Sequence, residues 1–146
     1  MEDALGNELA VGDLVAYAVR NNHQIRLRWG AVVRIWPEMA EMIGDGTRSR
    51  YTVFRTSEEL VKVLRGFPLP QTNDLCAYAI KHGGQRPKLR LGHVVAVMAD
   101  GHTLHLKGIG ICGRDLRRSS ANCIVCQKDE DPMILAADQA MAGALT

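Results

Sequence analysis

Residues 13–19 read DLVAYAV and residues 74–80 read DLCAYAI, and the likeness resumes as LRWGAVV at 27–33 and LRLGHVV at 89–95. One inserted residue in the second copy brings the two passages into register. A repeat of this kind indicates that the chain contains one structural unit twice. Each half has about seventy residues, which is small but sufficient for a compact domain.

Each copy begins with the same succession of elements. Residues 14–19 are apolar on both faces, which predicts a short strand buried on two sides. The polar, basic stretches 20–26 and 81–88 predict exposed loops. Longer strands are expected at 27–36 and 89–98, each around a glycine at which the strand bends.

The two copies differ after this second strand. In the second copy, residues 99–101 read ADG and predict a tight hairpin into a third strand at 102–106. In the first copy, residues 37–49 occupy that place and predict a protruding loop or a helical turn. The last strands are expected at 59–63 and 122–126.

These elements predict a mostly β protein made of two tandem small β-barrels. We expect the first barrel at 1–65, a linker at 66–72 and the second barrel at 73–131. Two prolines, at positions 68 and 70, make the linker stiff, which favours a fixed pose of the two barrels. Asp131 and Pro132 are typical of a helix start, so a short C-terminal helix is expected at 132–146.

The charge is unevenly distributed along the chain. The net charge is +2, with acidic residues near both ends and a basic interior from residue 81 to residue 128. Such asymmetry favours an anionic partner. No apolar run approaches the roughly 20 residues of a membrane span. Residues 1–3 lack the basic stretch, followed by an apolar one, of an export signal. We therefore expect a cytoplasmic protein without a membrane partner, whose four cysteines are thiols.

A family resemblance follows from the motifs at the start of each copy. GDLV at 12–15, a polar loop and GAVVRI at 30–35 resemble the opening of SH3-like barrels of the KOW and Tudor type. Over residues 11–65 and 72–128 the chain is also similar to bacteriophage-encoded tandem-barrel proteins of unassigned role. The resemblance implies binding to RNA, to ribosomes or to RNA polymerase.

Residues 108–113, GIGICG, match the letters of a dinucleotide-binding fingerprint. That fingerprint requires glycines that open a helix packed on a parallel sheet, and the polar stretch after residue 113 is unlike such a helix. We expect a loop and no cofactor. Its backbone amides, followed by Arg114, Arg117 and Arg118, are suited to hold a nucleic-acid phosphate.

Sulfur and imidazole groups sufficient for a zinc site occur at Cys112, Cys123, Cys126, His102 and His105. In a strand, residues three apart point to opposite faces, so Cys123 and Cys126 are expected to be buried apart from each other. We expect no metal. Nothing beyond residue type indicates a catalytic constellation, so an enzyme is not expected.

Aromatic residues are concentrated in the first copy. Tyr17 and Tyr78 occupy matching places and are expected in the cores. Trp29 and Trp36 have only aliphatic counterparts and are candidates for stacking a base or anchoring a partner protein.

The sequence therefore predicts a non-enzymatic binding module that associates with nucleic acid or a nucleic-acid machine. The candidate binding residues are Arg26, Arg28, Trp29, Trp36, Arg86, Lys88, Arg90, Arg114, Arg117 and Arg118. The alternative is a phage-type adaptor or inhibitor that binds a host protein of transcription, translation or defence through Met39, Met42 and Ile43. A structural component of a particle is a third possibility. The sequence fixes neither the ligand nor the oligomeric state.

Overall fold

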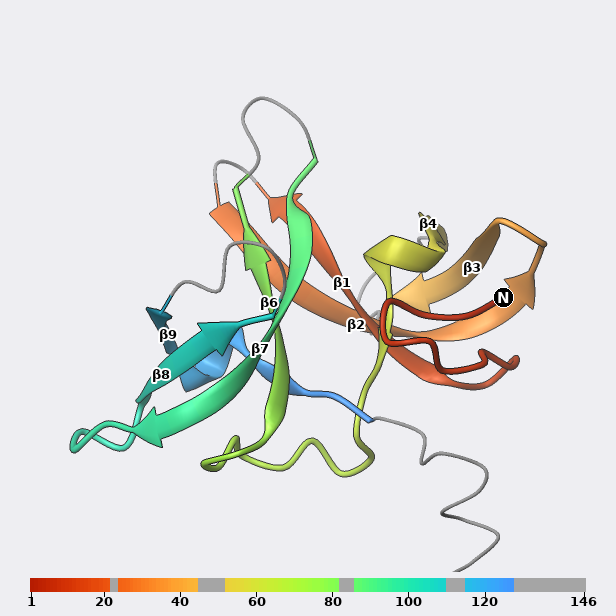
Figure 1. Ribbon diagram of the computed structural model, residues 1–146. Helices are drawn as coiled ribbons and strands as arrows, with labels where there is room; N and C mark the ends of the chain where they lie inside the picture. The colour runs from red at the N-terminus through yellow and green to blue at the C-terminus, as the bar shows by residue number, and fades with distance from the viewer. Residues whose placement is uncertain (22–23, 45–51, 82–85, 110–114, 128–146) are drawn as a thin grey trace, which may run out of the picture.

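The computed structural model describes residues 1–21, 24–44, 52–81, 86–109 and 115–127, and these form strands and two short 3₁₀ helices (Figure 1). The first half contains β1 (Leu14–Asn21), β2 (Gln24–Ile35), β3 (Met39–Gly44), β4 (Thr52–Thr56), the 3₁₀ helix η1 (Ser57–Glu59) and β5 (Val61–Lys62). The second half contains β6 (Leu75–Ile80), β7 (Lys88–Val97), β8 (Thr103–Gly108), β9 (Asp115–Ser119), the 3₁₀ helix η2 (Ser120–Asn122) and β10 (Ile124–Val125). The prediction of a mostly β protein is confirmed.

The two halves have the same topology. Each forms a five-stranded antiparallel sheet, in the order β4-β3-β2-β1-β5 and, correspondingly, β9-β8-β7-β6-β10. Within the described ranges no pairing joins β4 to β5 or β9 to β10, so the sheets are not closed into the expected barrels. The expected C-terminal helix at 132–146 lies outside the described residues.

Strand β1 is buried on both faces, as its sequence predicts. Val15 and Tyr17 point into a core that also contains Met42 and Leu60. Ala16, between them, belongs to a different cluster that contains residues of both halves. Alternate residues of one strand therefore face its own sheet and the other repeat.

The two halves meet along a seam with approximate two-fold symmetry. An antiparallel bridge pairs Val63 with Cys126. On either side of it, the backbone N–H of Leu64 donates to the carbonyl of Val125 at 3.0 Å, and the N–H of Gln127 donates to the carbonyl of Lys62 at 2.9 Å. These two hydrogen bonds join equivalent positions of the repeats, so the second is the symmetry counterpart of the first.

The N-terminal segment closes one side of this seam through buried polar groups. Asp3 Oδ1 accepts from the backbone N–H groups of Leu5 and Asn7, both at 2.9 Å. Asp3 Oδ2 accepts from Asn7 Nδ2 at 2.9 Å and from the Lys62 backbone at 2.8 Å. Asn7 Nδ2 also donates to the Gln127 carbonyl at 2.8 Å. The segment thereby joins β5 of the first repeat to the end of the second.

Strand β3 corrects the expectation of a protruding loop or helical turn at 37–49. Ala40 and Met42 are fully buried, whereas Met39 and Ile43 are exposed, which is the alternation of a strand with one buried face. The N–H of Trp36 donates to the carbonyl of Met39 at 2.8 Å and closes a tight turn. Residues 45–49 of the expected loop lie outside the described residues.

Other boundaries also differ from expectation. Residues 20–21 and 24–26 are not an exposed loop, because β1 and β2 pair up to Asn21 and Gln24. Residues 22–23, and residues 82–85 of the matching stretch, lie outside the described residues. Strands β4 and β9 were not expected. The helices η1 and η2 end at Glu59 and Asn122, and the strands expected at 59–63 and 122–126 are only two residues long. By contrast, the predicted hairpin at 99–101 is confirmed: Gly101 has a φ of 75°, and β7 pairs with β8 across the turn.

Close strand approach explains the glycine shared by both copies. A Cβ atom at Gly30 would lie 2.6 Å from the carbonyl oxygen of Ile43 on the neighbouring strand. At Gly92 a Cβ would lie 3.1 Å from the carbonyl of Lys107 and 3.3 Å from the ring of Tyr78. The expected bending role is therefore accompanied by a steric one, which is stricter in the first repeat.

We predict that Gly30→Ala destabilises the protein by about 1–3 kcal/mol or more, because the new methyl group collides with backbone that cannot rotate away. Gly92→Ala is the matched control and should cost less. Urea unfolding monitored by circular dichroism gives both values. Equal costs, or a larger cost at Gly92, would contradict the steric explanation.

Candidate nucleic-acid interface

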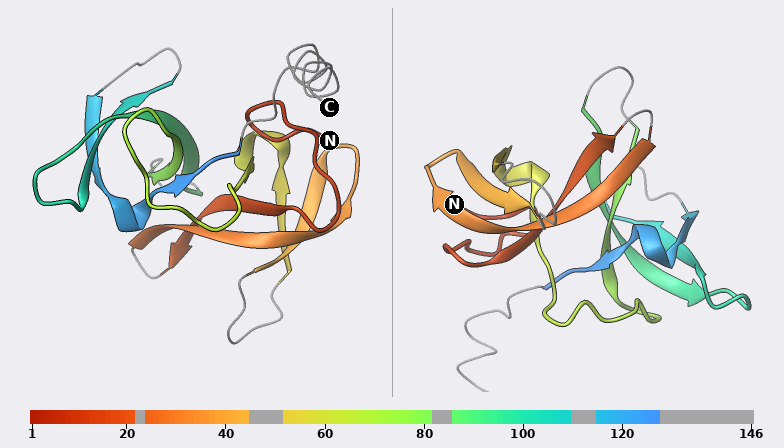
Figure 2. Two further views of the ribbon diagram at one scale, coloured as in Figure 1. Left: turned by 90° about the horizontal axis from the view of Figure 1, so that it is seen from below. Right: turned by 180° about the vertical axis from the view of Figure 1, so that it is seen from behind.

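The hairpins β1–β2 and β6–β7 extend to the same end of the molecule, at the top of Figure 1, and the view from behind in Figure 2 shows the same arrangement. We call this the hairpin end. Their facing sides pack together through Leu27 and Trp29 of β2 and through Leu89 and Leu91 of β7. The alternate residues of β2 and β7 therefore point to the outward face of each strand. On β7 this face borders a pocket that Lys88 and Arg90 line together with Thr56, Glu58 and Glu59 of the first repeat.

Four of the predicted cations occupy these outward positions. Arg26 and Arg28 lie on β2, and Lys88 and Arg90 lie at the matching places on β7. All four are exposed, whereas the residues between them are half-buried. The structure thus arranges them as two equivalent rows, one on each repeat, which we call the first row (Arg26, Arg28) and the second row (Lys88, Arg90).

A buried tyrosine anchors further cations beside the first row. Tyr17 is 1 % exposed and lies directly opposite Arg28 in the β1–β2 register. The guanidinium of Arg55, on β4, lies over the Tyr17 ring, 5.3 Å from its centroid. Arg55 also donates to the carbonyl of Ala18 at 3.3 Å. These contacts fix an arginine over the ring that lies opposite Arg28 of the first row.

The second repeat reproduces this arrangement. Tyr78 is 4 % exposed and lies opposite Arg90. Arg118, on β9, lies over its ring, with the guanidinium 5.7 Å from the centroid. Burial raises the pKa of the Tyr78 hydroxyl, while Arg118 and Arg90 act in the opposite direction. The predicted core positions of both tyrosines are confirmed.

Arg55 was missed by sequence reasoning. It follows Phe54 in a short strand with no motif of its own, and only alignment of β4 with β9 pairs it with Arg118. Burial lowers the pKa of Arg55, and the positive charge of Arg86 lowers it further. This repulsion indicates that cations of the two repeats lie close together here.

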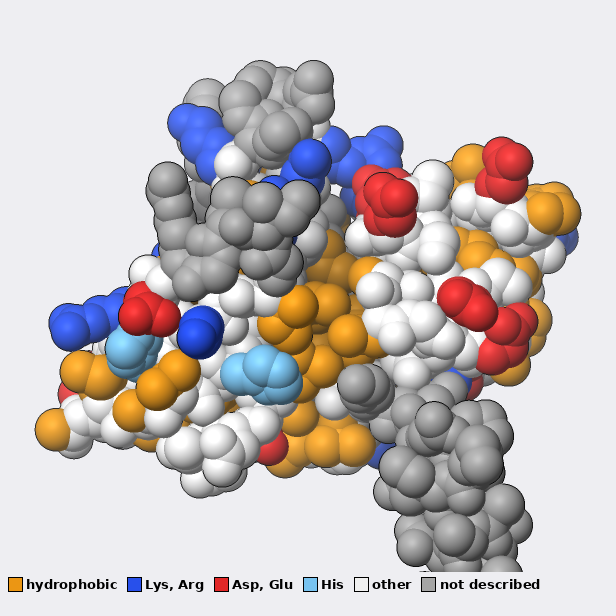
Figure 3. Space-filling view, in the orientation of Figure 1, with side chains coloured by type: hydrophobic (Ala, Val, Ile, Leu, Met, Phe, Trp, Pro, Cys, Tyr) orange, Lys and Arg blue, Asp and Glu red, His pale blue; other side chains and the backbone are white. Residues whose placement is uncertain are grey.

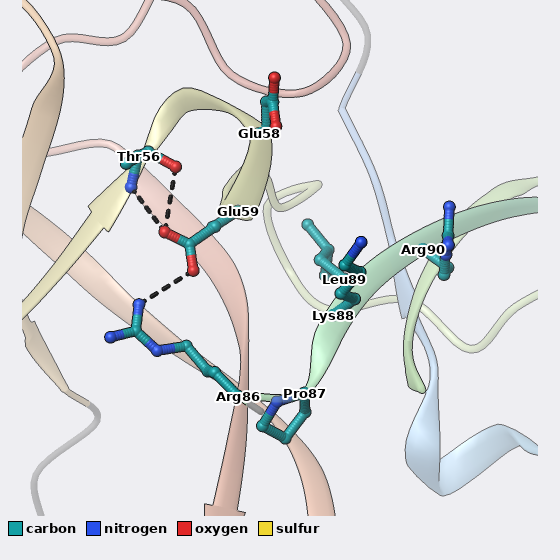
Figure 4. Close-up of a pocket in the computed structure, with 8 residues that line it drawn as sticks. All are labelled: Thr56, Glu58, Glu59, Arg86, Pro87, Lys88, Leu89 and Arg90. Atoms are coloured by element: carbon teal, nitrogen blue, oxygen red, sulfur yellow. Dashed lines mark hydrogen bonds and ion pairs between the residues drawn. The ribbon is translucent and has the colours of Figure 1, made fainter. Parts of the chain in front are cut away.

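Arg86 connects the repeats by an ion pair. Its Nη1 lies 3.0 Å from Glu59 Oε2 of η1 (Figure 4). Burial would raise the pKa of Glu59, but hydrogen bonds from Thr56 and Arg86 outweigh it and the pKa is lowered. A polar pocket of about 560 Å³ lies beside this pair, between η1 and the start of β7. Glu59 therefore already neutralises one of the predicted binding cations.

The space-filling view shows Lys and Arg side chains on both sides of the hairpin end, with the acidic side chains of this face mostly over the rest of the molecule (Figure 3). The predicted Arg117 is exposed on β9. Arg114 and residues 110–113 of the glycine-rich stretch lie outside the described residues.

The two tryptophans do not belong to this basic surface. Trp29 is half-buried between the repeats, and its ring centroid lies 4.9 Å from that of Phe67 in the connector. Trp36 is 37 % exposed at the β2–β3 turn, with the Phe54 ring 5.9 Å away and Arg34 over its own ring at 5.6 Å. Trp29 therefore contributes to the packing between the repeats, and Trp36 belongs to a separate patch.

The cysteines behave as buried hydrophobic residues. Cys123 packs in the second core, and Cys126 packs in the cluster between the repeats, so their predicted separation is confirmed. Burial raises the pKa of Cys76 to about 12 and that of Cys123 to about 11, and it also raises that of Cys126. Across the described ranges, no three His, Cys, Asp or Glu residues gather as a metal site, and Cys112 lies outside those ranges.

Comparison with known proteins gives one family match. Residues 1–63 match a family described as a domain of unknown function, DUF7205. The matched segment covers the first sheet together with the N-terminal segment and ends at the residue that bridges to Cys126. No curated protein matches the chain. In the described parts of the chain there is no helix long and apolar enough to cross a membrane.

We predict that Cys76, Cys123 and Cys126 resist iodoacetamide in the native protein at pH 8, because their raised pKa values keep them as thiols and burial blocks access. Peptide mass spectrometry should show alkylation of all three only after urea is added. Rapid native labelling of Cys123 or Cys126 would contradict the packing described.

Proposed function

We propose that this chain is a non-enzymatic binding module that holds the phosphate backbone of nucleic acid at its hairpin end. The proposal depends mainly on one observation, the presence of two matched rows of exposed cations on the two packed hairpins. Backbone phosphates are recognised by such cations without base contacts, and the release of counterions drives binding. The proposed site of action is the cytoplasm.

Each Tyr-anchored arginine supports the proposal. A guanidinium held over a ring by cation–π contact loses less conformational freedom when it meets a phosphate than a mobile side chain does. Arg55 and Arg118 are held in this way beside Arg28 and Arg90. Arginine also presents a planar fork of donors that fits phosphate oxygens.

We also infer that each repeat is an SH3-like unit of the KOW or Tudor kind. The support is the five-stranded sheet of identical order in both halves, with a 3₁₀ turn before each last strand. The resemblance of residues 11–65 and 72–128 to phage tandem-barrel proteins remains part of this proposal. A partner in transcription or translation is consistent with it.

We predict that the double variant Arg28→Gln, Arg90→Gln weakens nucleic-acid binding at least about tenfold, because it removes one phosphate contact from each row. The charge-matched control is Arg34→Gln, Arg65→Gln, which removes two exposed cations outside the two rows. Fluorescence anisotropy with a labelled oligonucleotide at two salt concentrations measures both affinities. Equal weakening in the control would mean that binding depends on the net charge alone. An absence of binding at low salt would refute the proposal.

A second candidate function is protein binding through the first repeat. Its outer face exposes Trp36, Met39, Ile43 and Phe54, next to Val33 at the β2–β3 bulge. Exposed aromatic and methionine side chains are typical of protein interfaces. This face supports the part of the adaptor hypothesis that concerns Met39 and Ile43. Met42 is buried and cannot contact a partner.

We predict for this candidate that the double variant Trp36→Ser, Phe54→Ser abolishes capture of a host protein from lysate treated with nuclease. The reason is that the variant removes both exposed aromatic rings of the patch. The control Val95→Ser, Val97→Ser changes two exposed apolar residues of the second repeat. A pull-down with quantitative mass spectrometry compares the three proteins. Capture that survives the first change, or that disappears after nuclease, would exclude this face.

A further inference from the structure

We propose that the pocket between η1 and the start of β7 is a binding site for one phosphate group, and that Glu59 competes with this phosphate for Arg86. The inference rests on the proposed function and adds to it a defined site and a residue that limits the affinity of that site. It depends on the cations of the pocket, on the partners of Glu59, and on the residues at the matching positions of the other repeat.

Three cations line one wall of the pocket. They are Arg86, Lys88 and Arg90, and all three are exposed. The positive charge of Arg86 also acts on Arg55, so a fourth cation lies close to this wall. The pocket has a volume of about 560 Å³, which is in the range of ligand pockets in proteins. Arginine and lysine side chains are the usual partners of phosphate oxygens.

Glu59 brings a negative charge to the opposite wall. Its Oε1 accepts hydrogen bonds from the backbone N–H and the hydroxyl of Thr56, at 3.1 and 3.0 Å. Its Oε2 lies 3.0 Å from Arg86 Nη1 (Figure 4). Although burial acts in the opposite direction, these hydrogen bonds lower the pKa of Glu59, so the carboxylate is charged at neutral pH. Thr56 therefore holds one oxygen of the carboxylate in place, while the other neutralises Arg86.

The ion pair can be exchanged for a phosphate. The side chains of Arg86 and Glu59 are 55 % and 31 % exposed, and solvent weakens an ion pair at such exposure. Among the described residues, the Glu59 carboxylate is ion-paired with Arg86 alone. A phosphate in the pocket meets Lys88 and Arg90 as well, and a guanidinium binds phosphate through two parallel hydrogen bonds. The phosphate therefore has more positive partners in this pocket than the carboxylate has.

The first repeat lacks this competitor. The helix η2 ends at Asn122, where η1 ends at Glu59. In the alignment that matches the two rows, Gln24 occupies the place of Arg86, and its Oε1 accepts from Arg26 Nε at 3.2 Å and from Nη2 at 2.6 Å. Both replacements are uncharged, so no carboxylate opposes the first row at these positions. The competition is a feature of the second row.

The experiment measures the affinity of four variants for a labelled oligonucleotide by fluorescence anisotropy at low salt. Glu59→Gln removes the charge and keeps an acceptor for Thr56, because glutamine also serves at this position of a capping box. Glu58→Gln is the matched control: it removes the same charge from the same pocket, and the Glu58 carboxylate points away from Arg86 (Figure 4). Arg86→Gln, alone and combined with Glu59→Gln, completes a double-mutant cycle. Thermal unfolding verifies that each variant folds.

We expect Glu59→Gln to bind about threefold to fivefold more tightly than the wild-type protein, because the phosphate no longer displaces a carboxylate from Arg86. Glu58→Gln should change the affinity by less than about twofold. In the presence of Arg86→Gln, Glu59→Gln should give no larger gain than Glu58→Gln gives. A gain of affinity cannot arise from a variant that merely fails to fold.

The oligonucleotide is used with a 5′-hydroxyl and with a 5′-phosphate, because both the backbone and the chain end supply phosphate groups. An equal gain of Glu59→Gln with both ligands assigns a backbone phosphate to the pocket. A gain with the 5′-phosphate alone assigns the chain end to it.

Three results would overturn the inference while leaving the proposed function intact. They are a Glu59→Gln protein that binds no more tightly than the wild type, equal gains from Glu59→Gln and Glu58→Gln, and a gain from Glu59→Gln that persists in full without Arg86. A wild-type protein that binds neither oligonucleotide at low salt would instead refute the proposed function itself.

Discussion

The contact between the two repeats is the constraint on which the rest of the structure depends. Units of this size bury a small fraction of their surface, so each gains much from an additional apolar contact. Strands β1 and β6 supply that contact with the face that does not point into their own core. Alanine at positions 16 and 77 leaves these faces flat, and both residues are fully buried. The hairpins are therefore held at a defined angle, and the cations on their outer faces are placed by the packing of their inner faces.

The N-terminal segment makes this contact unequal on its two sides. Asp3 is 3 % exposed, and its carboxylate accepts four hydrogen bonds, which compensates for the loss of water around its charge. Asn7 extends the network to the second repeat through Gln127. A polar N-terminal stretch gives no sign of this role in the sequence, because a buried and a solvated aspartate look alike until their partners are known.

Much of the fold can be predicted from the repeat, and the wrong predictions have physical reasons. Strand β1, the second strands and the hairpin at residues 99–101 have strong local signals, namely apolar faces and a turn-forming glycine. Strands β4 and β9 have one apolar inward residue each, Val53 and Leu116, so periodicity cannot reveal them. Strand β3 was predicted as a loop because its sequence, MAEMIG, has only one β-branched residue and includes a glutamate between its apolar positions.

The candidate site could also be predicted in part from the repeat. The rows on β2 and β7 could be read from the charges, because the strands that hold them are the repeated ones. The position of Trp29 away from this surface could not be predicted, because the sequence does not distinguish a half-buried ring from an exposed one. Its counterpart Leu91, which packs in the same cluster, shows that this position serves the contact between repeats.

The differences between the repeats distinguish the residues that the fold requires from the residues that each repeat exposes on its outer face. Ile43 and Phe54 of the first outer face are replaced by Lys107 and Arg117 in the second. Yet each repeat keeps an arginine over the ring of its buried tyrosine. A cation–π pair contributes about 0.5–1 kcal/mol at an exposed site and about 2 kcal/mol where it is desolvated. Burial lowers the pKa of Arg55, so the pair of the first repeat is partly desolvated. In both repeats the pair also fixes the position of a positive charge, over the ring of the tyrosine that lies opposite Arg28 or Arg90.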